Sequence, residues 1–427
     1  MLNDPRSHGL WERTALPASP TGRLGEHLVA KVAIVGGGYA GVSTALHLAE
    51  RGIDAVLLEA AQIGYGGAGR NVGLVNAGMW VMPEALLGEL GPVHGERLLD
   101  LLGDAPDLVF ALIEKHGIAC EAVRSGTLHC GLGASGFAEL RERAAQWQAR
   151  AAPVRLLDAA EAAAKTGCDA YSGALLDLRA GTIQPLAYVR GLAQAAMAAG
   201  ARLFTDSAAR SLRQDGDRWR IETDHGSLTA DWVVAATDAY TLGLWPELRA
   251  EQVHLPYFNF ATVPLSDNLR RSILPERQGA WDTAEILSSF RFDAAGRLIF
   301  GGVGALRGPG KSIHRAWARR AIRRLFPQIG DIGFESEWYG QIGMTANNLP
   351  RFHELAPQII GFAGYNGRGI APGTIFGQLL ARYIAGEIGR DELPLPVTAA
   401  APVPFRTAKE IFYEAGAQIA HISAHRI

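Results

Sequence analysis

The feature that most constrains the fold is a set of glycines directly after a short apolar stretch near the N-terminus. Residues 31–35 have the composition of a buried strand, and Gly36, Gly38 and Gly41 follow in a Gly-x-Gly-x-x-Gly turn. The apolar periodicity of 42–50 predicts a helix after the turn. Strand, glycine turn and helix in this order indicate the opening of a dinucleotide-binding fold, whereas the glycine pattern alone also fits an ordinary turn.

Each glycine of the turn has a separate physical task in such a fold. Gly36 permits the tight turn, Gly38 lets a pyrophosphate approach the backbone, and Gly41 lets the helix pack closely on the strand. Tyr39 and Ala40 lie in the turn before this helix, whose free N–H groups and positive dipole end face an anion. We therefore expect the phosphates of a nucleotide cofactor at this helix N-terminus.

An acidic residue stands where the ribose of such a cofactor would lie. A second strand, 53–58, ends at Glu59, which is followed by Ala60. A carboxylate there accepts hydrogen bonds from ribose hydroxyls and repels a 2′-phosphate. The pattern thus favours FAD or NAD over NADP.

A second glycine-rich stretch, 63–74, follows this acid. Glycines are needed where φ is positive or where a ligand comes close to the backbone, so this stretch is interpreted as a cofactor contact, with a flexible surface loop as the alternative. Its candidate contacts are Gly69, Arg70, Asn71, Val72, Gly73 and Leu74.

Composition excludes several classes of function. The chain of 427 residues has a formal net charge of −2, so no charge excess predicts binding to nucleic acid or anionic lipid. Cys120, Cys130 and Cys168 lack the spacing of a zinc site or a disulfide framework. No apolar run is long enough to span a membrane, and the first thirty residues lack the apolar core of a signal peptide. A cytoplasmic protein without a metal site is expected.

The rest of the chain alternates helical and extended patterns. Helices are predicted at 84–102, 106–116, 136–150, 185–200 and 316–326, with strands at 126–130 and 201–205 and a hairpin of 219–223 with 227–235. His129, on the first of these strands, has no His or acidic neighbour to make a metal site. Residues 1–27 are predicted to form an arm over the surface, and 393–427 a proline-rich link and a last helix. Near the C-terminus, 359–371 again has the pattern of a strand and a glycine-rich turn, and a helix is predicted after it to about Gly386.

Five motifs in this order resemble the D-amino acid oxidase (DAO) superfamily of FAD enzymes, and within it the gamma-glutamylputrescine oxidoreductases. They are 35–41 with Glu59, 69–73, 185–188, 236–241 and 364–369. The resemblance implies an α/β fold with an α+β second lobe: a Rossmann-like FAD-binding domain of the glutathione-reductase or DAO type, interleaved with an antiparallel-sheet substrate domain. The implied divisions are an N-terminal arm (1–30), a discontinuous FAD-binding domain (31–85, 165–248 and 340–390), a substrate-binding domain (86–164 and 249–339) and a C-terminal arm and helix (391–427).

The resemblance also implies further site residues. Beyond those given above, the residues implied to contact FAD are Ala209, Ala236, Thr237, Gly364, Tyr365, Asn366, Gly367, Arg368, Gly369 and Ile370. Tyr257, Arg291 and Trp338 are candidates for the substrate pocket, although a large aromatic ring is equally at home in a core. Arg291 or Arg368 would meet a glutamyl carboxylate, with a surface arginine as the alternative for each. No general base is identified.

Departures from the family pattern refine these expectations. Ala68 stands where the subfamily has Ser, and Asn347 replaces the Asp of a Thr-x-Asp-x-x-Pro pattern. Sarcosine oxidases attach their flavin to a Cys that matches Gly340, and hold the substrate carboxylate with a Lys that matches Ala371. FAD is therefore expected to be non-covalent, and a small α-amino acid is disfavoured as substrate.

The activity that the resemblance implies is oxidation of a gamma-glutamylated polyamine at a C–N bond. Hydride passes to the flavin, water hydrolyses the resulting imine to an aldehyde, and O2 or another acceptor takes the electrons. Two alternatives stay open at this point: a D-amino acid or other secondary-amine dehydrogenase of the same superfamily, and a non-catalytic flavin-binding module. The sequence leaves the oligomeric state undetermined.

Overall fold

The first of two large sheets carries the glycine turn. The computed structural model of the chain describes residues 8–241 and 243–424. Its first sheet has the order β17-β18-β11-β1-β2-β8, with β10 and then β9 added beside β11. These strands are β1 (His27–Val35), β2 (Ala55–Leu58), β8 (Arg202–Phe204), β9 (Ser211–Asp215), β10 (Arg218–Glu222), β11 (Ser227–Ala235), β17 (Arg351–Ala356) and β18 (Ile359–Ala363).

The centre of this sheet is parallel and buried. β1 pairs in parallel with β2 and β11, β2 with β8, and β11 with β18. Both faces of a parallel sheet require cover, which explains the continuous apolar runs of β1 and β2. Three helices lie together beside it: α2 (Tyr39–Ala49) contacts both α6 (Pro185–Ala198) and α10 (Ile370–Ile384). The expected β10–β11 hairpin is present, and β9 extends it.

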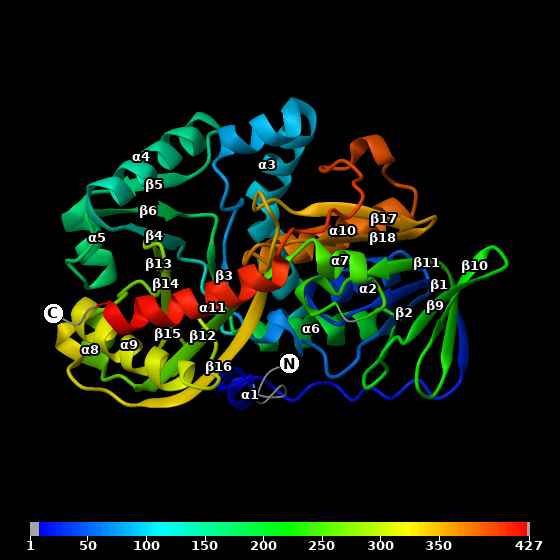
Figure 1. Cartoon of the computed structure of the whole chain (residues 1–427), viewed down its shortest axis with the longest axis horizontal. Coiled ribbons are helices and arrows are strands. Elements are labelled where there is room, and N and C mark those ends of the chain that lie inside the picture. The colour runs from blue at the N-terminus through cyan, green and yellow to red at the C-terminus, as the bar shows by residue number, and fades with distance from the viewer. Residues whose placement is uncertain (1–7, 242, 425–427) are drawn as a thin grey trace.

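The second sheet forms the other lobe (Figure 1) and is antiparallel except for one pair. Its order is β16-β12-β15-β14-β13-β4-β6-β5, with only β4 and β13 parallel. The strands are β4 (Thr127–Gly131), β5 (Val154–Leu157), β6 (Gly173–Asp177), β12 (Val253–Pro264), β13 (Gly279–Asp282), β14 (Ser288–Phe292), β15 (Arg297–Val303) and β16 (Phe334–Met344). The expected fold, an α/β domain with an antiparallel-sheet second lobe, is confirmed.

Helices cover this second sheet and enclose its core. They are α4 (Gly133–Ala149), α5 (Ala159–Thr166), α8 (Asp267–Ser272), α9 (Gly310–Leu325) and α11 (Arg406–Ser423). The core between sheet and helices is rich in aromatic rings, among them Phe258, Phe300 and Trp317. α11, the predicted last helix, packs on β12 and α9.

The remaining elements join the lobes. They are α1 (Leu10–Thr14), β3 (Leu74–Val75) paired with β7 (Gly181–Thr182), α3 (Pro83–His116) and α7 (Pro246–Ala250). Among the helices that the described residues form, none combines the length and apolar character needed to cross a bilayer.

Three expectations about the chain path need correction. The predicted helices 84–102 and 106–116 form the single element α3, whose break lies at Gly91 (φ 72°) because Pro92 disfavours helical backbone before it. The N-terminal arm is more than a surface strap, since Leu10 and Trp11 are fully buried. β6 belongs to the second sheet, although its residues were assigned to the FAD-binding domain.

Candidate active site

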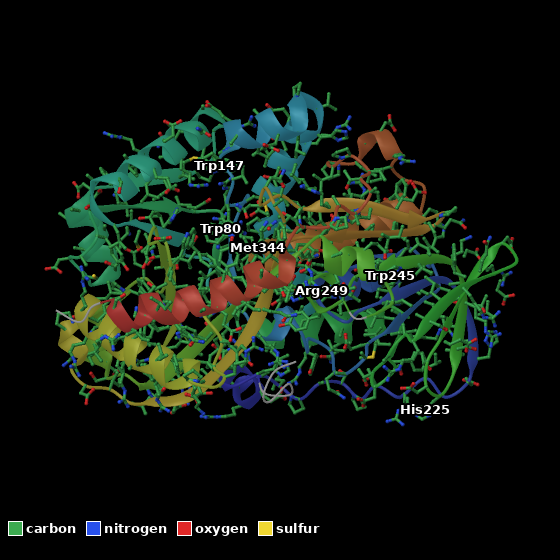
Figure 2. The ribbon with its side chains drawn as sticks, viewed as in Figure 1. Trp80, Trp147, His225, Trp245, Arg249 and Met344 are labelled. Atoms are coloured by element: carbon green, nitrogen blue, oxygen red, sulfur yellow. The ribbon has the colours of Figure 1, made fainter. Side chains whose placement is uncertain are left out.

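A cavity of about 840 Å³ lies between the two sheets and takes its walls from both. This volume is at the upper end of the range for sites that enclose a small molecule or cofactor. Its floor is formed by the carboxyl ends of β1, β2 and β11, where ligands of parallel sheets bind. Trp80 and Met344, labelled in Figure 2 near the meeting of the lobes, are among the wall residues.

The glycine turn is shaped as the sequence predicted. Gly36 has φ +114°, and a Cβ atom there would approach the Ala236 carbonyl oxygen to 2.5 Å. A Cβ at Gly41 would lie 2.0 Å from the Gly36 oxygen, so neither position accepts a side chain. Gly38 differs, because a Cβ there would meet only the Ala68 methyl, at 3.9 Å. Gly38 therefore leaves open space for a ligand against the backbone.

The start of α2 is free to bind an anion. Gly38 is its N-cap and offers no side-chain cap, so the first N–H groups of the helix keep their hydrogen-bonding capacity. Gly38, Tyr39 and Ala40 all line the cavity. An anionic pyrophosphate fits this position by charge and by hydrogen bonding.

Glu59 is fixed at the end of β2 by backbone donors. Its Oε2 accepts a hydrogen bond from Gly37 N at 2.7 Å and its Oε1 one from Ala61 N at 2.9 Å. Burial raises the pKa of the Glu59 carboxyl, while the backbone N–H groups oppose that shift. The side chain lines the cavity with lone pairs to spare, as a ribose-binding acid requires.

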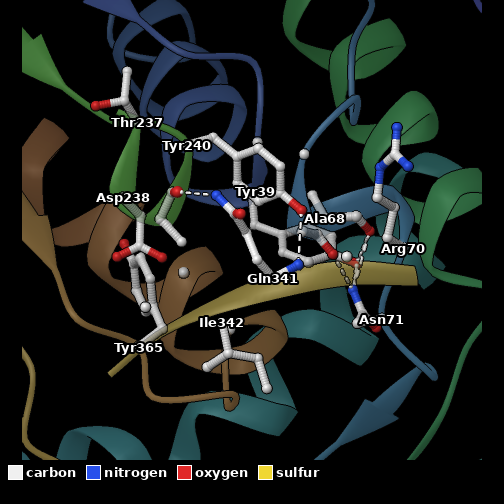
Figure 3. A pocket seen from close by; sticks show the side chains of 18 of the residues that line it. Tyr39, Ala68, Arg70, Asn71, Thr237, Asp238, Tyr240, Gln341, Ile342 and Tyr365 are labelled. Carbon is white, nitrogen blue, oxygen red and sulfur yellow. Dashed lines mark hydrogen bonds between the residues drawn. The ribbon is translucent and has the colours of Figure 1, made fainter. Parts of the chain in front are cut away.

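The glycine-rich loop after Glu59 is held rigid by one side-chain amide. Asn71 Nδ2 donates to the carbonyl oxygens of Gly67 (2.9 Å) and Ala68 (3.1 Å), two residues of the cavity wall in Figure 3. Its Oδ1 accepts from Gly73 N at 2.9 Å. Tyr39 O–H also donates to the Ala68 oxygen, at 2.7 Å. The loop is thus an ordered wall of the cavity, and the alternative of a flexible surface loop is wrong.

Arg70 anchors the same loop to the second lobe. Its guanidinium Nε donates to Tyr65 O at 2.8 Å and Nη1 to Tyr339 O at 3.4 Å. In Figure 3 the guanidinium points away from Tyr39 and Gln341, so Arg70 contributes to the cavity mainly through its backbone and stem.

A second set of contacts closes the C-terminal turn around the cavity. Asp238 Oδ1 accepts from Gly364 N at 2.8 Å, and burial raises the pKa of Asp238. Asn366, with φ 52°, accepts from Thr345 N at 2.8 Å through Oδ1. α10 begins beside this turn, and its N-cap Gly369 has no side-chain cap. This end of the cavity therefore favours negative charge.

The structure brings most of the predicted cofactor residues together. Those that line the cavity are Gly36, Gly38, Tyr39, Ala40, Glu59, Ala60, Arg70, Asn71, Val72, Leu74, Ala209, Ala236, Thr237, Tyr365, Asn366, Gly367, Gly369 and Ile370. Gly41, Gly69, Gly73 and Gly364 lie just behind the wall, where a Cβ would come within 2.3 Å of a neighbouring atom. These four glycines serve close backbone packing around the site. Arg368 lines a separate, smaller cavity.

The part of the cavity formed by the second lobe is apolar with a few hydroxyl groups. Tyr257, Trp281, Leu287, Ser289 and Val303 line it. Tyr257 Oη and Ser289 Oγ share a hydrogen bond of 2.7 Å, and burial raises the pKa of Tyr257. Among the described residues that line the whole cavity, the acids are Glu59 and Asp238, both tied to backbone N–H groups, and none is His or Lys.

Two of the three candidate substrate residues lie outside this cavity. Trp338 is buried, donates from Nε1 to Arg70 O at 3.0 Å and packs edge-on against Trp11. Arg291 is buried too, and Nη1 donates to Gly73 O at 3.3 Å and to Ile183 O. Both side chains therefore stabilise the 63–74 loop from the side away from the cavity, because the indole donates to Arg70 O and the guanidinium to Gly73 O.

Several wall residues have no motif in the sequence to reveal them. Trp80 Nε1 donates to Asn366 O at 2.6 Å, and Gln341 Nε2 to Ala239 O at 2.6 Å. Gln341 N also donates to Tyr240 Oη at 3.1 Å (Figure 3). Only their positions in the sequence could have indicated a role in the cavity wall. Trp80 follows the glycine-rich loop, and Gln341 follows Gly340, which matches the residue that binds the flavin in sarcosine oxidases.

Residues 31–383 match the DAO family of FAD dependent oxidoreductases. This chain belongs to that family. The chain is 30% identical to the gamma-glutamylputrescine oxidoreductase of Escherichia coli over 92% of this chain and 94% of that protein. It is 31% identical to the probable oxidoreductase OrdL of Rhizobium meliloti, covering 88% and 86%.

Solved structures agree with the fold of this DAO-family enzyme. Glycine oxidase from Geobacillus kaustophilus superposes with a TM-score of 0.71 at 21% identity, covering 87% of this chain and 99% of that one. L-proline dehydrogenase from P. horikoshii gives a TM-score of 0.70 at 16% identity, covering 86% and 97%. These two structures share the fold of the chain. The family match makes the chain an FAD-dependent oxidoreductase.

Proposed function

We propose that the protein oxidises a gamma-glutamylated polyamine, such as gamma-glutamylputrescine, at the C–N bond of its free amine. The observation that carries this proposal is the 30% identity to a gamma-glutamylputrescine oxidoreductase along nearly the full length of both chains. The large cavity continues past the cofactor residues to the second sheet, which leaves a region for a substrate beside the FAD.

The residues present fit FAD. The open backbone at Gly38 and the uncapped start of α2 would hold the pyrophosphate, and Glu59 the ribose. The ordered 63–74 loop and the start of α10 would hold the isoalloxazine, whose chemistry when bound is to accept a hydride equivalent from a carbon that bears nitrogen.

We propose that the FAD is non-covalent. Gly340 offers only backbone, and a Cβ there would already lie 3.1 Å from Arg70 Cβ and Tyr240 Oη. Cys120, Cys130 and Cys168 are buried, and none lines the cavity.

The protein's own contribution to the reaction is positioning. The second-lobe walls around Tyr257 and Trp281 are apolar and keep water from the reacting carbon, while the Tyr257 and Ser289 hydroxyls orient the amine nitrogen. No described cavity residue is a free base, so the amine must arrive already neutral. The overall change is R–CH2–NH2 plus O2 plus H2O to R–CHO plus NH3 plus H2O2, with O2 proposed as acceptor.

An anaerobic titration of the FAD-loaded protein with gamma-glutamylputrescine tests this function. We expect the flavin absorbance near 450 nm to bleach and to recover when air is admitted. A flavin that bleaches only with a D-amino acid or another secondary amine would indicate the alternative dehydrogenase activity. A flavin that no amine reduces would indicate a non-catalytic flavin-binding module.

A further inference from the structure

A second, much smaller cavity lies beside the large one, and its walls carry two buried arginines and a buried histidine. Its volume is about 20 Å³, enough for a single water molecule or one carboxylate oxygen. Asn76 and Trp281 line both cavities, so they form the boundary between them. Arg368, Arg143 and His129 line the small cavity only.

These three side chains are buried, and each keeps a nitrogen without a partner. The exposed fractions are 9% for Arg368, 7% for Arg143 and 5% for His129. Among the described residues, no hydrogen-bond acceptor or donor reaches Arg368 Nε, Arg143 Nε or His129 Nδ1. An unpaired buried polar atom is costly, so an unfilled set of this size indicates a ligand.

Tryptophan rings hold Arg368 in place without neutralising it. The guanidinium lies over the Trp80 ring at 4.7 Å and the Trp281 ring at 5.5 Å, and Nη1 donates to Ala77 O at 2.8 Å. The His129 ring stacks on the Trp281 ring, and the two ring centroids are 5.0 Å apart. The Trp281 indole N–H also has no partner among the described residues.

The carboxylates nearby are already engaged. Asp177 also lines the small cavity, but it forms a bidentate pair with Arg179, with distances of 2.7 and 3.0 Å. Glu139 lies 3.3 Å from Arg143, but its side chain is 44% exposed. Burial and the neighbouring Arg143 lower the pKa of Arg368 to about 9. The cavity wall thus holds positive charge in excess of its acids, and such buried charge calls for an anion.

We propose that Arg368, Arg143 and His129 form an anion subsite that receives the carboxylate of the substrate, entering past Asn76 and Trp281 from the large cavity. This inference rests on the proposed function, because it assigns the amino-acid end of the amine to this subsite and leaves the amine end in the large cavity. The small cavity takes one oxygen of that carboxylate, and the other oxygen stays at the boundary with the large cavity. The subsite selects amines that carry an acid over neutral amines of equal length.

The subsite can be tested with two amides that differ only in the presence of a carboxylate. N-glutarylputrescine ends in a carboxylate, and N-pentanoylputrescine has a methyl group in its place. We would measure the rate of anaerobic flavin reduction against the concentration of each amide. Hydrogen bonds to charged groups predict that Arg368→Met raises the half-saturating concentration of the glutaryl amide about 10- to 100-fold and that of the pentanoyl amide less than about twofold.

Matched variants separate charge from structure. Arg368→Lys should recover part of the lost preference, because the charge remains but the fork is lost. Arg202→Met removes an exposed arginine that pairs with Asp54 at the far sheet edge and should change neither amide. Arg143→Met gives an independent reading if Arg368→Met fails to fold. The proposal would be overturned if Arg368→Met and Arg143→Met each weakened the glutaryl and the pentanoyl amide equally. It would also be overturned if neither variant changed the half-saturating concentration of either amide.

Direct binding distinguishes failure of the subsite from failure of the proposed function. If neither amide bleaches the wild-type flavin, the proposed substrate is wrong, and calorimetric titration of the holoenzyme with glutarate still tests the subsite. Binding to the wild type that Arg368→Met abolishes would support an anion subsite for another acid. Absence of glutarate binding to the wild type would refute it.

Discussion

Replacement of Glu59 by glutamine is the most direct test of the cofactor site. In the wild type, both carboxylate oxygens accept a backbone hydrogen bond, from Gly37 N at 2.7 Å and Ala61 N at 2.9 Å. The Glu59→Gln side chain would turn an NH2 group toward one of those N–H donors and remove the charge from the ribose acceptor. Each hydrogen bond to a charged group contributes about 1.5–3 kcal/mol, so the Kd for FAD should rise about 10- to 150-fold.

The pH dependence of FAD binding sharpens this test. Burial raises the pKa of Glu59 in the FAD-free protein, whereas ribose hydroxyl donors stabilise the ionised form. FAD binding should therefore release a proton, and affinity should increase as pH rises through the raised pKa. In the FAD-free protein the linkage runs the other way: the contribution of Glu59 to stability is present at low pH and is lost as pH rises through its folded pKa.

The assay is titration of apoprotein with FAD, followed by quenching of flavin fluorescence at several pH values. The variant Glu222→Gln is the control, because Glu222 pairs with Arg220 on β10 away from the cavity. A Kd for Glu59→Gln within twofold of the wild type, or an unchanged pH slope, would refute the assignment of Glu59 to the ribose.

Four further perturbations give expected outcomes. Gly41→Ala would place a methyl group 2.0 Å from a backbone oxygen, so the free energy of unfolding should fall by at least about 1–3 kcal/mol and FAD should be lost. The control Gly88→Ala places its methyl group in open space and should have the melting temperature of the wild type. Tyr257→Phe should keep FAD and raise the half-saturating amine concentration roughly 2- to 10-fold; unchanged reduction kinetics would remove Tyr257 from the substrate wall. Trp338→Ala should destabilise by about 3–5 kcal/mol in urea unfolding because a buried ring is lost, and an unchanged stability with slowed flavin reduction would return Trp338 to the substrate site. Burial lowers the pKa of His314 to about 4, so the wild type should lose about 2 kcal/mol more stability between pH 7 and pH 5 than His314→Gln; equal losses would contradict that burial effect.

The parts of the site that follow from local chain chemistry could be predicted from the sequence. The turn requires glycine at three positions. In the structure Gly36 lies against the Ala236 carbonyl and Gly41 against the Gly36 carbonyl, while Gly38 faces open space. Glu59 follows because it ends a strand beside that turn. These are constraints over a few residues, which a single sequence carries.

The substrate wall depends on long-range pairing, which local pattern does not carry. Trp281 and Ser289 reach the cavity because β13 pairs with β4 and β14 with β15, across a register that the sequence leaves open. Trp338 illustrates the same point from the other side, since its position beside the flavin segment suggested a substrate contact. Its neighbour in space, Trp11, comes from the N-terminal arm, and this contact together with the hydrogen bond to Arg70 O places Trp338 in the core.

The order of strands in the first sheet has a consequence for how the enzyme is made. β1 lies between β2 and β11, and β11 pairs in turn with β18, so the glycine turn that opens the chain is completed by strands from its middle and end. A ribosome has therefore released most of the polypeptide before the sheet can close. Until then the apolar faces of β1 and α2 remain uncovered, and exposed apolar surface of this kind is prone to aggregation. Because Ala236 and Tyr365 line the same cavity as Gly36, that cavity is complete only when segments from the start, the middle and the end of the chain are in place.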